Sequence, residues 1–85
     1  MKIKRTNSFL KDYRTLSAEI QAQVDKQLTL LIENPRHPSL RLKKLKGTGI
    51  FAIRVSKGYR LTLRYESRVL ELRRVGTHDL LQKEG

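Results

Sequence analysis

The sequence predicts an α+β domain in which an antiparallel meander of three strands packs one face on an αα-hairpin. Apolar residues recur at helical spacing as far as Glu33, and they alternate with polar residues from Ile50 onward. Turn residues divide the alternating region into three short strands. The whole chain, residues 1–85, has the length of a single domain with the element order β-α-α-β-β-β.

Two helices are expected after a short first strand at residues 2–5. Residues 6–8 offer N-cap oxygens for a helix that begins near Ser8, and Ser17 is placed to cap a second helix. The second helix is expected to end at Glu33, because the residue before Pro35 is disfavoured in the α region. The apolar stripes of the two helices are Phe9, Tyr13 and Leu16, and Ile20, Val24, Leu28 and Leu31.

A basic loop and three strands complete the predicted fold. Residues 35–49 have no clear period and are expected to form a loop, pinned to the core by Leu40, Leu42 and Leu45. A three-residue hairpin loop at 56–58, with Gly58 in a left-handed conformation, and a turn at Ser67-Arg68 separate the strands. The side chains expected to face the core are Phe51, Ile53, Val55, Tyr59, Leu61, Leu63, Tyr65, Leu70 and Leu72.

The two turns predict which strand residues lie opposite each other. The expected pairs of the buried face are Val55 with Tyr59, Ile53 with Leu61, Phe51 with Leu63, Tyr65 with Leu70 and Leu63 with Leu72. The expected pairs of the other face are Arg54 with Arg60, Arg64 with Glu71 and Thr62 with Arg73. Arg64 then has a carboxylate partner, whereas Arg54, Arg60 and Arg73 gather on the open face without one.

The charge of the chain is concentrated in its middle third. Nineteen Lys and Arg against eight Asp and Glu give a formal charge of +11, and residues 34–65 contain nine basic side chains and no acidic one. Such a charge favours an anionic partner such as nucleic acid, a ribosome, an acidic protein or a membrane surface. The absence of cysteine excludes disulfides, thiolate metal sites and a thiol nucleophile. No apolar run reaches membrane-spanning length and no signal peptide is recognised, so a cytoplasmic protein is expected.

Two interpretations of the open-face arginines stay open at this point. Long arginine side chains can extend into water at little cost. Alternatively, their guanidinium groups bind phosphate, which they match in bidentate geometry without losing their charge.

His78 is the main candidate for proton transfer. It follows the last strand, close in sequence to Arg73, whereas His37 lies in the basic loop between two prolines. A histidine beside a strand end can also be structural or simply exposed. Histidine beside arginine and lysine suits metal-free RNA cleavage, in which the 2′-hydroxyl attacks the adjacent phosphate. No zinc motif, P-loop or dinucleotide-binding motif is present, and no cofactor is expected.

The sequence resembles the RelE/ParE superfamily of bacterial type II toxin–antitoxin toxins. The resemblance lies in R-V-S-K-G-Y-R over 54–60, in G-T-H over 76–78 and in the order of elements along nearly the whole chain. The G-T-H ending is more typical of the RNA-cleaving members, especially the YafQ-like ones. The resemblance implies a RelE-like fold and an mRNA interferase that cleaves messages in the ribosomal decoding site.

The resemblance also implies roles for individual residues. Arg60 would bind the phosphate or the transition state, with Arg54 as its companion and His78 as the acid or base. Arg73 would belong to the phosphate-binding face, and His37 matches a further histidine of the YafQ-like members. Lys43, Lys44 and Lys46 would contact the RNA backbone or 16S ribosomal RNA.

The implied partner is a cognate antitoxin that wraps the toxin with an acidic or amphipathic segment, giving a hetero-oligomer that does not involve a membrane. Two other functions remain open. One is inhibition of DNA gyrase, as for ParE toxins, since a shared fold does not fix the function. The other is non-catalytic binding of RNA or antitoxin, because Leu80 and Leu81 stand where many RNA-cleaving relatives have Tyr or Phe.

Overall fold

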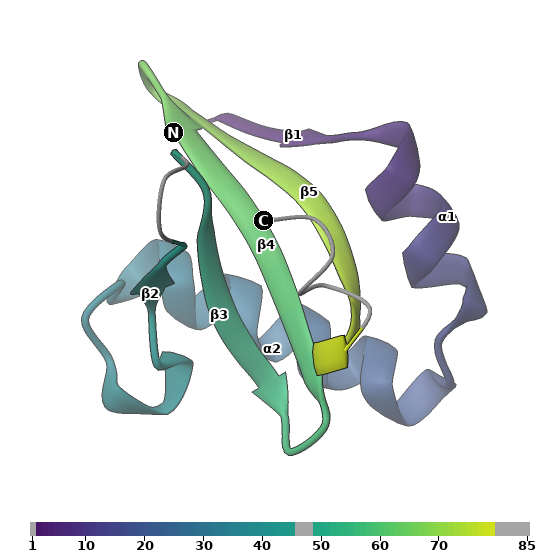
Figure 1. The fold of residues 1–85 in the computed structure, drawn as a ribbon. Helices are drawn as coiled ribbons and strands as arrows, with labels where there is room; N and C mark the ends of the chain where they lie inside the picture. The colour runs from purple at the N-terminus through teal and green to yellow at the C-terminus, as the bar shows by residue number, and fades with distance from the viewer. Residues whose placement is uncertain (1, 46–48, 80–85) are drawn as a thin grey trace.

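The computed structural model describes residues 2–45 and 49–79 and shows an α+β fold. The described strands form one mixed sheet in the order β1-β5-β4-β3-β2, and both α-helices cover the same face of it (Figure 1). The elements are β1 (Lys2–Arg5), α1 (Asn7–Thr15), α2 (Ala18–Glu33), the 3₁₀ helix η1 (Pro38–Leu40), β2 (Lys43–Lys44), β3 (Phe51–Ser56), β4 (Tyr59–Glu66) and β5 (Val69–Thr77). The predicted fold class is confirmed. Among the described residues, no helix is long and apolar enough to cross a membrane.

Both helices begin at the side-chain caps that the sequence offers. Thr6 accepts a hydrogen bond from the Phe9 amide at 3.0 Å, so α1 starts one residue earlier than expected. Ser17 accepts from the Ile20 amide at 3.2 Å and caps α2, which ends at Glu33 as predicted. The two helices are joined through Leu16 and Ser17 alone, and α1 packs on β5 while α2 packs on β3.

The core lies between the helices and the inner face of the sheet. Its buried members are Phe9, Val24, Leu28, Leu31, Leu40, Ile53, Val55, Leu61, Leu63, Leu70, Leu72 and Val75. The expectation that Tyr65 and Leu42 are core residues is wrong, because both are 39% exposed. Tyr65 lies near the end of β4, where its ring meets the edge of Phe51 at a centroid distance of 5.9 Å.

The segment expected to be a basic loop contains regular structure. Residues 38–40 form η1, and Arg41 then takes a left-handed conformation with φ of 48°. Lys43 and Lys44 form β2, which pairs antiparallel with Ala52 and Phe51 of β3. Two residues are too short for an alternating pattern, so periodicity could not reveal this strand.

The β3–β4 hairpin differs from the prediction at its turn. Ile53 pairs with Leu61, Phe51 with Leu63 and Arg54 with Arg60, as expected, but Ser56 and not Val55 pairs with Tyr59. A register shift after Arg54 therefore shortens the loop to Lys57-Gly58. The left-handed conformation expected at Gly58 is also absent. The bulge keeps Val55 buried while it moves Ser56 into the ladder.

A second irregularity lies in β5, where α1 meets the sheet. The pairs Tyr65 with Leu70, Arg64 with Glu71 and Leu63 with Leu72 are as predicted, but Thr62 pairs with Arg74 and not with Arg73. The Thr62 hydroxyl is fully buried and accepts from the Arg74 amide at 3.1 Å.

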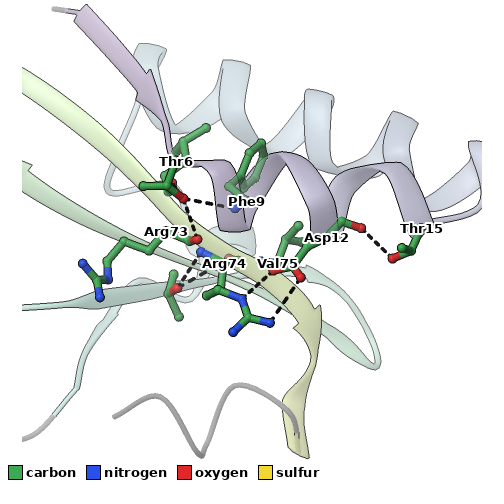
Figure 2. Close-up of polar contacts among 9 residues, drawn as sticks. Thr6, Phe9, Asp12, Thr15, Arg73, Arg74 and Val75 are labelled. Atoms are coloured by element: carbon green, nitrogen blue, oxygen red, sulfur yellow. Dashed lines mark hydrogen bonds and ion pairs between the residues drawn. The ribbon is translucent and has the colours of Figure 1, made fainter.

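Asp12 of α1 holds the bulged part of β5. Its carboxylate accepts from the Arg74 guanidinium at 2.7 and 3.2 Å and from the Val75 amide at 3.1 Å (Figure 2). The Thr6 hydroxyl contacts the carbonyl oxygens of Leu72 and Arg73 at 3.0 and 2.9 Å. Thr6 and Asp12 thus satisfy backbone groups of β5 at and beyond Leu72, the last residue that pairs with β1.

We expect Asp12→Ala to lower the free energy of unfolding by about 1.5–3 kcal/mol, because it removes a charged acceptor from the amide of buried Val75 and from the partly exposed Arg74 guanidinium. Urea unfolding measures the change. Asp25→Ala is the matched control, since the Asp25 carboxylate accepts only from the Tyr13 hydroxyl at an exposed position. Equal losses for the two variants would contradict a special role for Asp12.

Candidate functional site

Arg54 and Arg60 lie opposite each other on the sheet face that the helices leave uncovered. Ile53 and Leu61 beside them are fully buried, so alternation directs the two arginines to the other face. Directly opposed residues of antiparallel strands have Cβ atoms about 4.5–5.5 Å apart. The described residues provide no carboxylate within ion-pairing distance of either guanidinium. The predicted pair of like charges is therefore present.

The Arg60 guanidinium is held by the hairpin turn. Its Nη1 donates to the carbonyl oxygens of Ser56 and Tyr59, both at 2.9 Å. Those two bonds use both N–H groups of Nη1, and the described residues offer no partner to Nε or Nη2. The edge formed by Nε and Nη2 is the one that pairs with two oxygens of a phosphate.

His78 reaches the same end of the hairpin from β5. Its amide donates to the Gly58 carbonyl oxygen at 3.2 Å, and Thr77 pairs with Tyr59. Strand spacings place the Cα atom of His78 roughly 8 Å from that of Arg60. Arg54 of β3, Arg60 of β4 and His78, which directly follows β5, thus lie at the same end of the sheet, and we call them the hairpin-end cluster. Both arginines are half-buried and His78 is exposed.

Arg73 does not join this cluster as an unneutralised cation. Its guanidinium bonds to the Glu71 carboxylate at 3.4 Å, and Figure 2 shows its side chain directed away from Asp12. Glu71 also contacts Lys4 at 3.9 Å, while no ion pair with Arg64 is formed among the described residues. The expected partners are therefore exchanged: Glu71 neutralises Arg73 and not Arg64. The physical reason is the bulge in β5, which removes Arg73 from the position opposite Thr62.

The remaining predicted residues lie outside the cluster. Lys43 and Lys44 are exposed on β2, at the far side of β3, and Lys46 falls outside the described residues. His37 caps η1, because its Nδ1 accepts from the Ser39 amide at 3.1 Å. Its position thus has a structural explanation. In the described ranges, no three His, Asp or Glu side chains gather as a metal site requires.

Sequence reasoning missed a groove that begins at Arg54. The groove has a volume of about 580 Å³ and lies between α2, η1 and the outer edge of β3. We call it the β3-edge groove. Its polar and charged lining includes Gln23, Lys26, Gln27, Arg41, Arg54 and Lys57. The spacing of Gln23 and Gln27 at i and i+4 beside the apolar stripe of α2 was the one available signal.

Solved structures share the fold of this chain. YafQ from E. coli superposes with a TM-score of 0.80 at 22% identity, over 94% of this chain and 96% of that one. A YoeB/ParE toxin from Agrobacterium tumefaciens gives a TM-score of 0.77 at 21% identity, over 92% and 99%. The chain has the fold of the RelE/ParE toxins. A structure of the E. coli RelBE toxin–antitoxin complex also matches, with a TM-score of 0.73 at 28% identity over 89% and 94% of the two chains.

Searches of family models and of curated proteins give no match. The resemblance to RelE/ParE toxins that the sequence indicated is therefore confirmed through the fold.

The Arg54–Arg60 pair makes a measurable prediction for this RelE-like fold. We expect Arg54→Gln to raise the free energy of unfolding by up to about 1 kcal/mol at low salt, because it removes repulsion across the strand pair. The gain in unfolding free energy should shrink in about 0.5 M salt, because dissolved ions then screen the repulsion between exposed charges within a few ångströms. Arg60→Gln is the matched comparison and should not stabilise, since it also loses two bonds to the turn. Urea unfolding at two salt concentrations measures both, and destabilisation by Arg54→Gln at low salt would contradict the repulsion.

Proposed function

We propose that this chain is the toxin of a type II toxin–antitoxin system and that it cleaves messenger RNA on the ribosome without a metal ion. The observation that carries the proposal is the hairpin-end cluster: Arg54 pairs with Arg60 across the two strands, and the His78 amide donates to Gly58 at the turn between them. The fold shared with YafQ and RelE supports the assignment to this class of toxin. A toxin acting on ribosomes would work in the cytoplasm.

The arginines would bind the scissile phosphate. The Nε and Nη2 edge of Arg60 would hold two phosphate oxygens, and Arg54 across the strand pair would add a second positive charge. Because arginine serves as a fixed cation and a hydrogen-bond donor, both guanidinium groups would stabilise negative charge and would not transfer protons. An anion at this place would also remove the repulsion between them.

His78 would transfer a proton in the same step. The 2′-oxygen forms a bond to phosphorus while the bond from phosphorus to the 5′-oxygen breaks, leaving a 2′,3′-cyclic phosphate and a 5′-hydroxyl. One proton leaves the 2′-hydroxyl and one reaches the 5′-oxygen. Histidine is the one residue type of the three that commonly serves as a general acid or base, so His78 would carry one of these transfers.

The basic middle of the chain would serve the two macromolecular partners. Lys43 and Lys44 are exposed on β2 and would contact ribosomal RNA. The excess of positive charge in residues 34–65 would attract an acidic segment of a cognate antitoxin. YafQ and RelE have each been solved in toxin–antitoxin complexes, DinJ-YafQ and RelBE. A hetero-oligomer with an antitoxin is the assembly that we propose here.

Expression of the protein should arrest growth and produce new RNA 5′ ends within translated messages. We expect Arg60→Ala to reduce cleavage on isolated ribosomes by about 100-fold or more, since a donor to the transition-state charge is lost. His78→Ala should reduce it by about 100-fold to 10,000-fold through loss of proton transfer. Arg14→Ala is the control, because Arg14 is exposed on α1 away from the cluster.

Different lesions would identify the alternatives. Full toxicity of both variants would contradict the assigned site. Intact messages together with trapped gyrase–DNA breaks would show a gyrase inhibitor, and binding of RNA or antitoxin without new RNA ends would show a non-catalytic relative.

A further inference from the structure

The β3-edge groove has a chemistry that the hairpin-end cluster does not use. We propose that it binds the ribonucleotide next to the scissile phosphate, with the phosphate held by its cations and the ribose 2′-hydroxyl held by Gln23. This inference rests on the proposed function, because it extends the same RNA strand. Its volume of about 580 Å³ lies within the usual range for small-ligand sites of about 300–1,000 Å³.

Four positively charged residues line the groove, and the lining residues that the structure describes include no carboxylate. Lys26 comes from α2, Arg41 follows η1, and Arg54 and Lys57 belong to β3 and its turn. Arg41, Lys26 and Lys57 make no ion pair with the described residues. Cations that converge on one concavity repel each other, and a bound phosphate removes this repulsion.

Gln23, one of the residues that line the groove, has a buried side-chain acceptor to which no described residue donates. The side-chain oxygen Oε1 of Gln23 is buried and has no hydrogen-bond partner among the described residues. Leaving such an atom without a partner costs about 1–3 kcal/mol. The neighbouring amide of Gln27 is already engaged, because its Nε2 donates to the carbonyl oxygens of Arg54 at 2.8 Å and Ser39 at 3.4 Å.

A ribonucleotide satisfies both requirements in one ligand. Phosphate diester oxygens accept hydrogen bonds and carry the negative charge, but they have no hydrogen to donate to Gln23. The ribose 2′-hydroxyl is a donor one sugar away from that charge, and it is the group by which proteins distinguish RNA from DNA. A site with four cations for the phosphate and one unsatisfied acceptor for the 2′-hydroxyl should therefore bind RNA more tightly than DNA.

The groove is continuous with the proposed cleavage site through Arg54. Arg54 belongs both to the hairpin-end cluster, through its pairing with Arg60, and to the residues that line the groove. Strand β2 pairs with β3 at Phe51 and Ala52. At Arg54 the edge of β3 instead faces α2, where Gln27 donates to the Arg54 carbonyl oxygen. An RNA strand bound at Arg60 can therefore cross the edge of β3 and enter the groove.

Equilibrium binding of labelled oligonucleotides tests this inference apart from cleavage. The probes are a fluorescein-labelled single-stranded hexaribonucleotide and the DNA of the same sequence, both measured in the His78→Ala background so that the probe stays intact. Gln23→Met should weaken RNA binding by about threefold to tenfold and leave DNA binding unchanged. Unchanged DNA binding also shows that the variant is folded.

Lys26→Gln supplies the electrostatic half of the test. It should weaken both probes and reduce the slope of log K against log salt concentration by about 0.7, which corresponds to one phosphate contact. Lys11→Gln, an exposed lysine on α1, is the matched control and should leave the slope unchanged.

Several results would overturn the inference while leaving cleavage at the cluster intact. One is that the His78→Ala protein, with Gln23 and Lys26 intact, binds RNA and DNA with equal affinity or binds neither probe. Another is that Gln23→Met and Lys26→Gln bind RNA as the parent does. If the same two variants instead weaken only an antitoxin complex, an acidic protein segment occupies the groove and the RNA assignment fails.

Discussion

The pairing of β3 with β4 is the constraint on which the rest of this structure depends. Ile53 and Leu61 must both enter the core, and they lie opposite each other in the ladder. Alternation then forces Arg54 and Arg60 onto the uncovered face as direct neighbours. Burial of the apolar side chains of two strands therefore holds two like charges together, although their mutual repulsion opposes this geometry.

Much of this arrangement could be predicted from the sequence, because it follows from period and from side-chain caps. The cap at Ser17 and the stop after Glu33 predict the bounds of α2. The alternation from Phe51 to Leu63 predicts the pairing of β3 with β4 as far as Arg54. The bulges could not be predicted in this way. The one in β5 depends on Thr62 and Asp12, which are distant in sequence from Arg73 and act through tertiary contacts. This is why the ion-pair partners of Glu71 were assigned wrongly.

The proposed RNA sites and the stability of the fold make opposite demands on the basic residues. Arg54 and Arg60 repel each other, and the cations of the β3-edge groove converge with no carboxylate among its described lining residues. The contacts of Asp12 and Thr6 with β5 lie at the other side of the sheet and supply stability there. A buried acceptor at Gln23 fits the same pattern, because a site prepared for a ligand leaves groups unsatisfied until the ligand binds.

The free-energy coupling between Arg54 and Arg60 tests this account most directly. A double-mutant cycle of unfolding free energies, with each arginine replaced by glutamine, measures it in the absence and in the presence of a short single-stranded RNA. The account predicts an unfavourable coupling in the free protein that disappears or becomes favourable when RNA is bound. A coupling that RNA leaves unchanged would show that no phosphate lies between the two guanidinium groups.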